Sequence, residues 1–275
     1  MSFRTPGGIR YRFSGLLVIL FLLLPQSISF AGVASNVQPE RLPRYQPRFY
    51  PFDGGEKAFY QASWNGIPVG SAEIHTGPLF LEGKKFYYVR VQARTWKYLE
   101  PIWKMRDSIE SVFEARTLQP RRFIFRQREN RKKIDTTALF DPRGKKWKVE
   151  RRQGSNVKEY EFSSQQTLDP IAAVYLARTL DLKVGDSLHL EVFGGQSRYL
   201  VDLHVAGKER ITLGDREVEA FKIIPQVRNL NGSGYAGRMR QAVGWISADE
   251  KRTPLRMVSQ VFIGSVYIEM VEQKS

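Results

Sequence analysis

Polar and apolar side chains alternate with a period of two residues along most of this chain. A β-strand places successive side chains on opposite faces, so this alternation is typical of strands with one buried face. In residues 84–96, for example, Tyr87 and Val89 fall on one face of the expected strand. Asn65-Gly66 is a hairpin turn signal, and most other connections are also short, which favours antiparallel neighbours.

The alternation therefore predicts a mainly β fold: one large curved antiparallel sheet or a partly open barrel, in a single domain over residues 53–275. The expected strands occupy residues 57–64, 68–76, 84–96, 107–115, 121–129, 132–140, 145–152, 156–162, 187–194, 197–207, 216–227, 241–248, 254–264 and 265–273.

One segment, TLDPIAAVYLARTLDLKVGDS at residues 167–187, departs from this pattern. Asp169 is a good helix N-cap, and Pro170 suits the first helical position. No polar residue follows until Arg178, whereas a surface helix would show a polar stripe within that length. We expect a single buried helix at about 169–180 that fills the core of the curved sheet. Val174 and Leu176 lie about 200° apart on such a helix, and we expect both to be buried.

The N-terminus has the layout of a secretory signal peptide. Three arginines precede the apolar run Gly15–Leu24, and Ser29-Phe30-Ala31 supplies a small-residue cleavage site. Ten apolar residues are too few to cross a bilayer, which needs about 20. We expect residues 1–31 to be removed, with no membrane-spanning segment in the mature chain, and residues 32–52, which contain four prolines, to form an extended arm. The chain has no cysteine, which excludes a lipid anchor and suits a bacterial periplasm.

Positive charge is concentrated in one part of the chain. The formal net charge is +15, and residues 84–160 hold 22 basic and 9 acidic side chains. The alternation places the basic candidates of two expected strands on the face opposite their apolar residues; these candidates are Arg122, Arg126, Arg128, Lys146 and Lys148. Outside the cytoplasm, nucleic acid is not an expected partner. The expected partners are an anionic lipid, a lipopolysaccharide-like molecule or another acidic envelope component, and the alternative is a solvated face without a partner.

No catalytic or metal constellation is visible in the sequence. His75, His189 and His204 lie on separate expected strands, no cysteine accompanies them, and no Gly-x-Ser-x-Gly motif is present. Gly232–Gly237 matches a dinucleotide fingerprint by letters, but an expected strand follows it where that fold needs a helix. We therefore expect no enzyme activity, no metal and no cofactor.

Large aromatic residues interrupt the strand pattern in one connection, at Trp96, Tyr98 and Trp103. Such residues either cap a core or line the entrance to a ligand site. If the helix is a movable lid, Leu176 on its inner side would join them at that site.

Several short motifs occur together in a characteristic order: Gly55-Glu56, Trp64–Gly70, Asp169-Pro170, Gly185-Asp186, Gly244–Ser247, Pro254-Leu255 and Gly264. Over about residues 53–272 they resemble the bacterial secreted family called domain of unknown function 3108. The resemblance implies an envelope location in a Gram-negative bacterium and a curved antiparallel sheet with a helix. That shape is similar in outline to periplasmic lipoprotein carriers, and the family implies no activity and no catalytic residue.

Three classes of function remain. The first is a periplasmic protein that binds an amphiphile, such as a lipid or a lipid-linked sugar. The second is an interaction module without a cavity, which docks on acidic polymer or on a protein through its basic face. The third is a hydrolase assembled from residues distant in sequence, which no motif supports.

Overall fold

The computed structural model describes residues 42–230, 242–260 and 264–274, and these residues form one antiparallel sheet of fourteen strands with one α-helix. The strands are β1 (Glu56–Trp64), β2 (Ile67–Leu81), β3 (Lys84–Thr95), β4 (Arg106–Glu114), β5 (Pro120–Glu129), β6 (Lys132–Asp141), β7 (Lys146–Gln153), β8 (Asn156–Ser163), β9 (Ser187–Phe193), β10 (Arg198–Leu213), β11 (Arg216–Asn229), β12 (Ala242–Ser247), β13 (Pro254–Gln260) and β14 (Ser265–Lys274). The predicted mainly β fold is confirmed. The expected signal peptide and the glycine-rich segment 232–237 lie outside the described residues.

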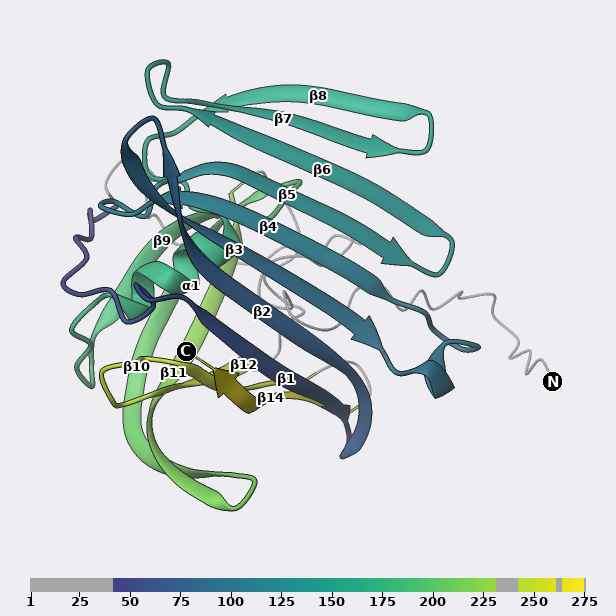
Figure 1. Ribbon diagram of the computed structural model, residues 1–275, viewed down its shortest axis with the longest axis vertical. Helices are drawn as coiled ribbons and strands as arrows, with labels where there is room; N and C mark the ends of the chain where they lie inside the picture. Colours follow the sequence, from purple (N-terminus) through teal and green to yellow (C-terminus); the bar gives the residue numbers. More distant parts are fainter. Residues whose placement is uncertain (1–41, 231–241, 261–263, 275) are drawn as a thin grey trace.

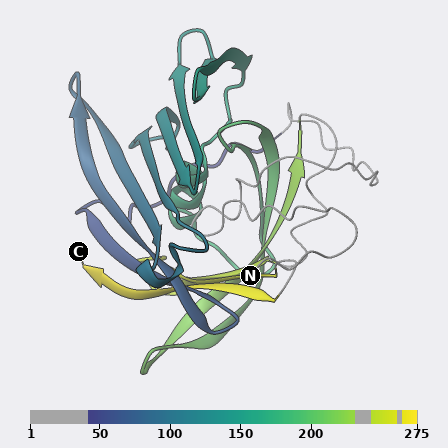
Figure 2. The ribbon, with the colours of Figure 1, turned by 90° about the vertical axis from the view of Figure 1, so that its right-hand side faces the viewer.

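The first and last strands lie side by side in the middle of the sheet. The strand order is β8-β7-β6-β5-β4-β3-β2-β1-β14-β13-β12-β11-β10-β9, so the chain forms two meanders that join where β1 pairs with β14 (Figure 1). Ala62 faces Ile268 across this junction. The sheet bends strongly, and Figure 2 shows the blue and teal strands of the first meander facing the green strands of the second across the yellow β14.

The helix α1 (Pro170–Arg178) lies on the inner, concave face of this bend. Asp169 is its N-cap, as predicted, and its Oδ1 accepts hydrogen bonds from the amides of Ile171 and Ala172, each at 2.9 Å. The Ser111 hydroxyl on β4 donates to Asp169 Oδ2 at 2.6 Å. One buried carboxylate therefore caps the helix and attaches it to the sheet. None of the helices in the described part of the chain has the length and hydrophobicity needed to cross a bilayer.

The two ends of the strands differ. At the helix end, which carries the turn 82–83 and the connections 115–119 and 142–145, large aromatic side chains fill the inner face around α1. Phe52 and Tyr175 meet there at 4.7 Å between ring centroids. The far end carries the connections 65–66, 96–105, 130–131 and 154–155, away from the helix.

Strands β8 and β9 are the two edges of the sheet, and side chains rather than backbone bonds bring them together near the helix end. The ring centroids of Phe162 on β8 and Phe193 on β9 are 5.3 Å apart. The Phe162 ring also stacks on the indole of Trp147. The Tyr160 hydroxyl donates to the carbonyl of Gln196 at 3.3 Å. The barrel is therefore incomplete in its backbone bonding.

The expectation that both Val174 and Leu176 are buried is wrong for Val174. Leu176 is 5% exposed, but Val174 is 44% exposed. A nine-residue helix on a concave sheet is covered on most sides, and the side that carries Val174 faces solvent. Arg178 departs from the usual exposure of charged residues in the opposite direction, since it is only 2% exposed. The apolar run thus indicated the burial of the helix but not its orientation.

This orientation predicts unequal effects of two matched truncations. Leu176→Ala should lower the free energy of unfolding by about 2–4 kcal/mol, because it removes buried methyl groups from the main core. Val174→Ala should change it by less than about 0.5 kcal/mol, as is usual for surface substitutions. Urea titration followed by tryptophan fluorescence measures both. Equal losses at the two positions would contradict this placement of the helix.

Candidate functional site

The five predicted basic residues lie on the outer, convex face of the sheet. Arg122, Arg126 and Arg128 are on β5, and Lys146 and Lys148 are on β7, with β6 between them. The register aligns Arg122 with Leu139 of β6, and Leu139 with Lys148. The five residues therefore lie on one face, across three adjacent strands; their role in binding an anion stays a prediction.

Acidic neighbours compensate most of this charge. Arg126 pairs with Glu110 at 3.2 Å and Arg128 with Asp135 at 2.6 Å. Lys146 and Lys148 both approach Glu161, at 3.6 and 3.8 Å. Among the described residues, Arg122 alone of the five has no ion pair. Exposed pairs of this kind are weak, so the face stays available to an anion but with a smaller field than the charge count suggests.

The predicted aromatic connection between β3 and β4 lies at the far end of the sheet. Its 3-10 helix η2 (Lys97–Leu99) begins a compact turn in which the amide of Trp103 donates to the carbonyl of Leu99 at 2.7 Å. Leu99 and Trp103 pack against the inner face, while Tyr98 is 58% exposed and points away from it. One side of the connection is therefore packed on the buried inner face, and the other side is exposed.

Small side chains form the inner face beside this connection. Ala62 on β1, Ala72 on β2 and Ala93 on β3 belong to one buried cluster, here called the far-end cluster, with Tyr60 and Met105. At the helix end the inner face carries several large aromatic residues, among them Tyr87 on β3 and Phe113 on β4. Leu176 lies in that helix-end core, so the structure does not bring it together with the other three residues of the predicted entrance.

Two indole groups at the far end are unusual. The Nε1 atoms of Trp96 and Trp103 are buried and have no hydrogen-bond acceptor among the described residues. A buried indole N–H normally finds an acceptor, because an unmet donor lowers stability. Both N–H groups are therefore buried donors whose hydrogen bonds are unmet within the described residues. The sequence indicated the aromatic residues but not the state of their nitrogens.

An acidic pair that sequence reasoning missed also lies on the inner face. Asp107 on β4 aligns with Ala93 and accepts a hydrogen bond from the amide of Arg128 at 2.7 Å. Burial, with the nearby charge of Glu129, raises the pKa of Asp107 from 3.8 to about 7. Glu129 is itself buried, its Oε1 has no partner, and its Oε2 lies 3.9 Å from Lys132 Nζ. Glu129 lies two residues after the buried Gln127 on β5, so the alternation of this strand places the Glu129 side chain on the inner face. That alternation is the sequence signal that could have identified it.

The described residues contain no group of three or more His, Cys, Asp or Glu side chains that could hold a metal ion.

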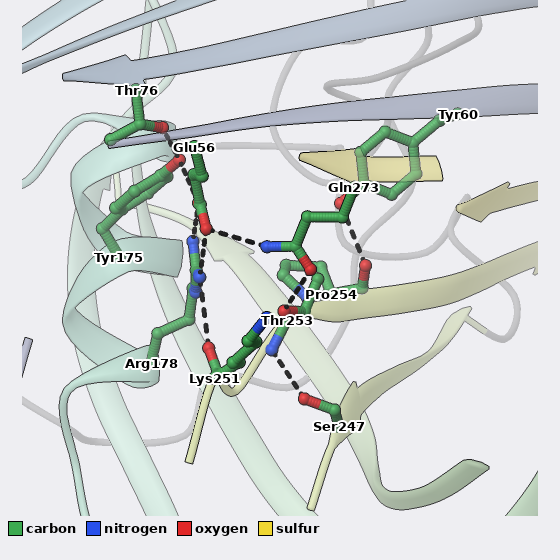
Figure 3. A network of polar contacts seen from close by, with 10 residues as sticks. All are labelled: Glu56, Tyr60, Thr76, Tyr175, Arg178, Ser247, Lys251, Thr253, Pro254 and Gln273. Atoms are coloured by element: carbon green, nitrogen blue, oxygen red, sulfur yellow. Dashed lines mark hydrogen bonds and ion pairs between the residues drawn. The ribbon is translucent and has the colours of Figure 1, made fainter. Parts of the chain in front are cut away.

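A buried polar network joins the helix to the first and last strands (Figure 3). Both guanidinium NH groups of Arg178 donate to the Glu56 carboxylate, and the Arg178 Nη2–Glu56 Oε2 distance is 2.9 Å. The Tyr175 hydroxyl donates to Glu56 Oε1 at 3.1 Å, and Gln273 Nε2 donates to Glu56 Oε2 at 3.0 Å. Residues from β1, α1 and β14 thus share one carboxylate.

The network continues into the turn between β12 and β13. Arg178 Nη2 also donates to the Lys251 carbonyl at 3.1 Å, and the Thr253 hydroxyl donates to Gln273 at 3.0 Å. Burial raises the pKa of Tyr175 well above its ordinary value, so its phenol stays protonated as a donor. Arg178 Nε has no partner among the described residues, but both Nη atoms bind the Glu56 carboxylate. Because the two buried charges are paired, we interpret this network, here called the lock, as a structural element rather than a reactive centre.

Breaking the lock on one side should be strongly destabilising. Arg178→Met leaves the Glu56 carboxylate buried without its counter-charge, and the free energy of unfolding should fall by about 3–5 kcal/mol. The double variant Arg178→Met with Glu56→Gln should recover part of this loss. The matched control, Arg152→Met, removes an exposed pair with Glu150 and should change stability by less than about 1 kcal/mol. Chemical denaturation measures all three, and a loss at Arg178 no larger than at Arg152 would contradict the interpretation.

The raised pKa of Asp107 predicts a pH-dependent stability. Between pH 4 and pH 7 the folded protein keeps this proton while the unfolded chain releases it, so stability should fall as the pH rises through that range. Asp169, whose pKa burial raises to about 6, contributes in the same sense. Asp107→Asn should therefore reduce the loss of stability with rising pH without abolishing it. Asp215→Asn, in an exposed turn, should leave that pH dependence unchanged. Tm values from pH 4 to pH 8 test this, and parallel curves for Asp107→Asn and the parent would rule it out.

Comparison with solved structures supports the architecture. A beta-barrel-like protein of domain of unknown function DUF1849 from Brucella abortus superposes with a TM-score of 0.56 at 9% sequence identity, covering 81% of this chain and 98% of that chain. Such a similarity is evidence about the fold alone.

Two further structures match with lower scores. A "putative lipoprotein" from Parabacteroides distasonis has a TM-score of 0.38 at 9% identity, covering 83% of this chain and 99% of that one. A "putative exported protein with YmcC-like fold" from Bacteroides fragilis has a TM-score of 0.35 at 8% identity, covering 83% and 100%. No curated protein matches the sequence.

The family model described as "Protein of unknown function (DUF3108)" matches residues 60–271, which is most of the chain. The match includes Ala62, Ala72 and Ala93 of the far-end cluster, and Tyr175 and Arg178 of the polar network. The resemblance inferred from the ordered short motifs is thereby confirmed: the chain belongs to the DUF3108 family.

Proposed function

We propose that this protein is a non-catalytic binding protein of the cell envelope, which holds the apolar part of an amphiphile against the far-end cluster. The ligand class is a lipid or a lipid-linked sugar. The observation that carries the proposal is the contrast between the two ends of one inner face, with aromatic side chains around the helix and alanines beside the connection 96–105.

The far-end cluster suits an acyl chain because its side chains are small and apolar. Ala62, Ala72 and Ala93 are buried on three adjacent strands, so a larger apolar group would pack against them by displacing the side chains that cover them. Removing apolar surface from water contributes about 25 cal/mol per Å², or about 0.8 kcal/mol for each buried methylene group. A few methylene groups are therefore enough for measurable binding.

The polar end of such a ligand would find donors at the edge of the same cluster. The indole N–H groups of Trp96 and Trp103 have no acceptor among the described residues, and an ester, carboxylate or sugar oxygen would satisfy them. Aromatic residues with a polar edge commonly mark the boundary between an apolar site and water. This arrangement supports a ligand with one apolar and one polar end.

The predicted signal peptide, the absence of cysteine and the expected Gram-negative source support the periplasm as the location. Binding without catalysis is supported by the state of two deeply buried carboxylates. Glu56 and Asp169 each accept several hydrogen bonds within the fold, so their oxygens are committed to structure.

A second candidate function is docking on an acidic envelope component through the outer face. It is favoured by Arg122, which has no ion pair in the described part of the chain and lies in register with the exposed Leu139 and with Lys148. This function needs no ligand on the inner face.

A fluorescent long-chain fatty acid, titrated at concentrations below its critical micelle concentration, tests the first proposal. Ala93→Phe places a large side chain in the far-end cluster and should weaken binding at least tenfold. Gln92→Phe introduces the same side chain one position away on the outer face of β3, and should leave binding unchanged. Native mass spectrometry of protein purified from the periplasm should show a bound amphiphile in the parent and less in Ala93→Phe.

The controls separate binding from folding. Thermal melts establish that each variant is folded, and Ala72→Leu serves as a second filling variant if Ala93→Phe is unstable. Absence of fatty-acid binding in the parent would rule out the first proposal. So would equal binding by folded filling variants and Gln92→Phe.

A further inference from the structure

We propose that the far end of the sheet docks on the surface of an anionic lipid bilayer. Three exposed apolar residues, Ile67, Tyr98 and Ile102, would lie among the lipid headgroups, with basic side chains of the same end against the lipid phosphates. The rim patch, as the term is used here, consists of Ile67, Tyr98 and Ile102 with the basic residues Lys97 and Arg131. The inference rests on the proposed function, because a protein that holds a membrane amphiphile has to meet the membrane that contains it.

The apolar part of the rim patch is contiguous and unusually exposed. Ile102 is 81% exposed and Ile67 is 57% exposed. The Tyr98 hydroxyl donates to the carbonyl of Pro68, next to Ile67, and the amide of Trp96 donates to the Val69 carbonyl at 3.1 Å. The connection therefore lies against the start of β2. Contiguous exposed apolar surface of this kind marks interaction sites for proteins or membranes.

The rim patch is held in shape before it meets a partner. The amide of Ile102 donates to the Leu99 carbonyl at 2.9 Å, and the amide of Thr95 donates to the Met105 carbonyl at 3.2 Å. Leu99 and Trp103 anchor the turn in the far-end cluster. Because this connection is already ordered, insertion of Tyr98 and Ile102 would need little loss of backbone entropy.

Positive charge surrounds these apolar residues. Residues 94–106 and 129–133 together hold seven basic and two acidic side chains. Lys104 and Arg106 pair with Glu100, and Lys132 pairs with Glu129, so the excess is carried by the other basic residues. The two segments are neighbours, because the amide of Asn130 donates to the Lys104 carbonyl at 2.7 Å and the Lys104 amide donates to Asn130 Oδ1 at 2.8 Å. Lys97 and Arg131 are exposed and have no ion pair among the described residues. An apolar patch with a basic border complements an anionic bilayer better than it does a neutral protein surface.

The helix end also presents apolar side chains, and it provides the control. Phe80, at the tip of the β2–β3 hairpin, is 68% exposed. That tip lies beyond the helix-end aromatic core, whereas the rim patch connects directly to the far-end cluster through Leu99 and Trp103. Docking through the rim patch places the inner ligand face next to the bilayer, and this favours the far end.

Flotation of the exported protein with lipid vesicles tests the inference. The vesicles contain phosphatidylethanolamine with either 25% phosphatidylglycerol or 25% phosphatidylcholine, and we expect binding to the anionic vesicles that weakens steeply with salt. The double variant Tyr98→Ser with Ile102→Ser should bind these vesicles at least tenfold more weakly. Phe80→Ser, the matched variant at the opposite end, should bind like the parent.

A charge variant, Lys97→Gln with Arg131→Gln, should bind the anionic vesicles more weakly and with less salt dependence. All variants should retain fatty-acid binding in solution. If the parent itself binds no fatty acid, the proposed function is contradicted, but vesicle docking can still be measured. Absence of vesicle binding by the parent would overturn the docking inference. So would unchanged binding by folded Tyr98→Ser with Ile102→Ser, or a loss in Phe80→Ser as large as in that variant.

Discussion

The buried pair between Glu56 and Arg178 is the interaction on which the rest of the structure depends. Glu56 begins the first strand, Arg178 ends the helix, and Gln273 near the end of the last strand binds the same carboxylate. A buried ion pair contributes little net stability compared with apolar residues of the same volume, but it tolerates few alternative arrangements. Its effect here is to specify how two meanders and one helix meet.

The ligand site that we propose lies at the opposite end of the sheet from this lock. The helix and its aromatic neighbours fill the inner face near Glu56, and the small side chains of that face lie beyond Tyr60, toward the connection 96–105. Charges are compensated both on the outer face and in the segments beside the rim patch, where Lys104 and Arg106 pair with Glu100. At the rim patch itself, Lys97 and Arg131 have no ion pair among the described residues.

Much of the fold could be predicted because its signals are local. Alternation located the strands, and Asp169-Pro170 located the start of the helix, since capping depends on residues within one turn. The burial of Arg178 and the exposure of Val174 could not be predicted in the same way. Arg178 is buried because of a carboxylate 122 residues earlier in the chain, and Val174 is exposed because of the direction from which the sheet covers the helix.

The candidate site was predictable only in part for a similar reason. The aromatic residues of the connection 96–105 stand out in the sequence, and two of the three predicted there, Trp96 and Trp103, have buried nitrogens at the far end. Their neighbours do not stand out, because alanine on a strand has no signature until the register sets Ala72 opposite Ala93. Asp107 and Glu129 come together only through cross-strand pairing and an inward orientation.

The central position of β1 and β14 has a consequence for the order of events during synthesis. Asn65 and Ser265 are hydrogen-bonded across 200 residues of sequence, so the middle of the sheet is the last part that can form. Two meanders can assemble as the chain emerges, but each keeps an unpaired strand edge until the final residues are released. Pairing between such distant segments is intrinsically slow. A chain whose central strand pair closes last keeps an open edge on each meander until that pairing forms, and until then those edges can pair with strands of other chains.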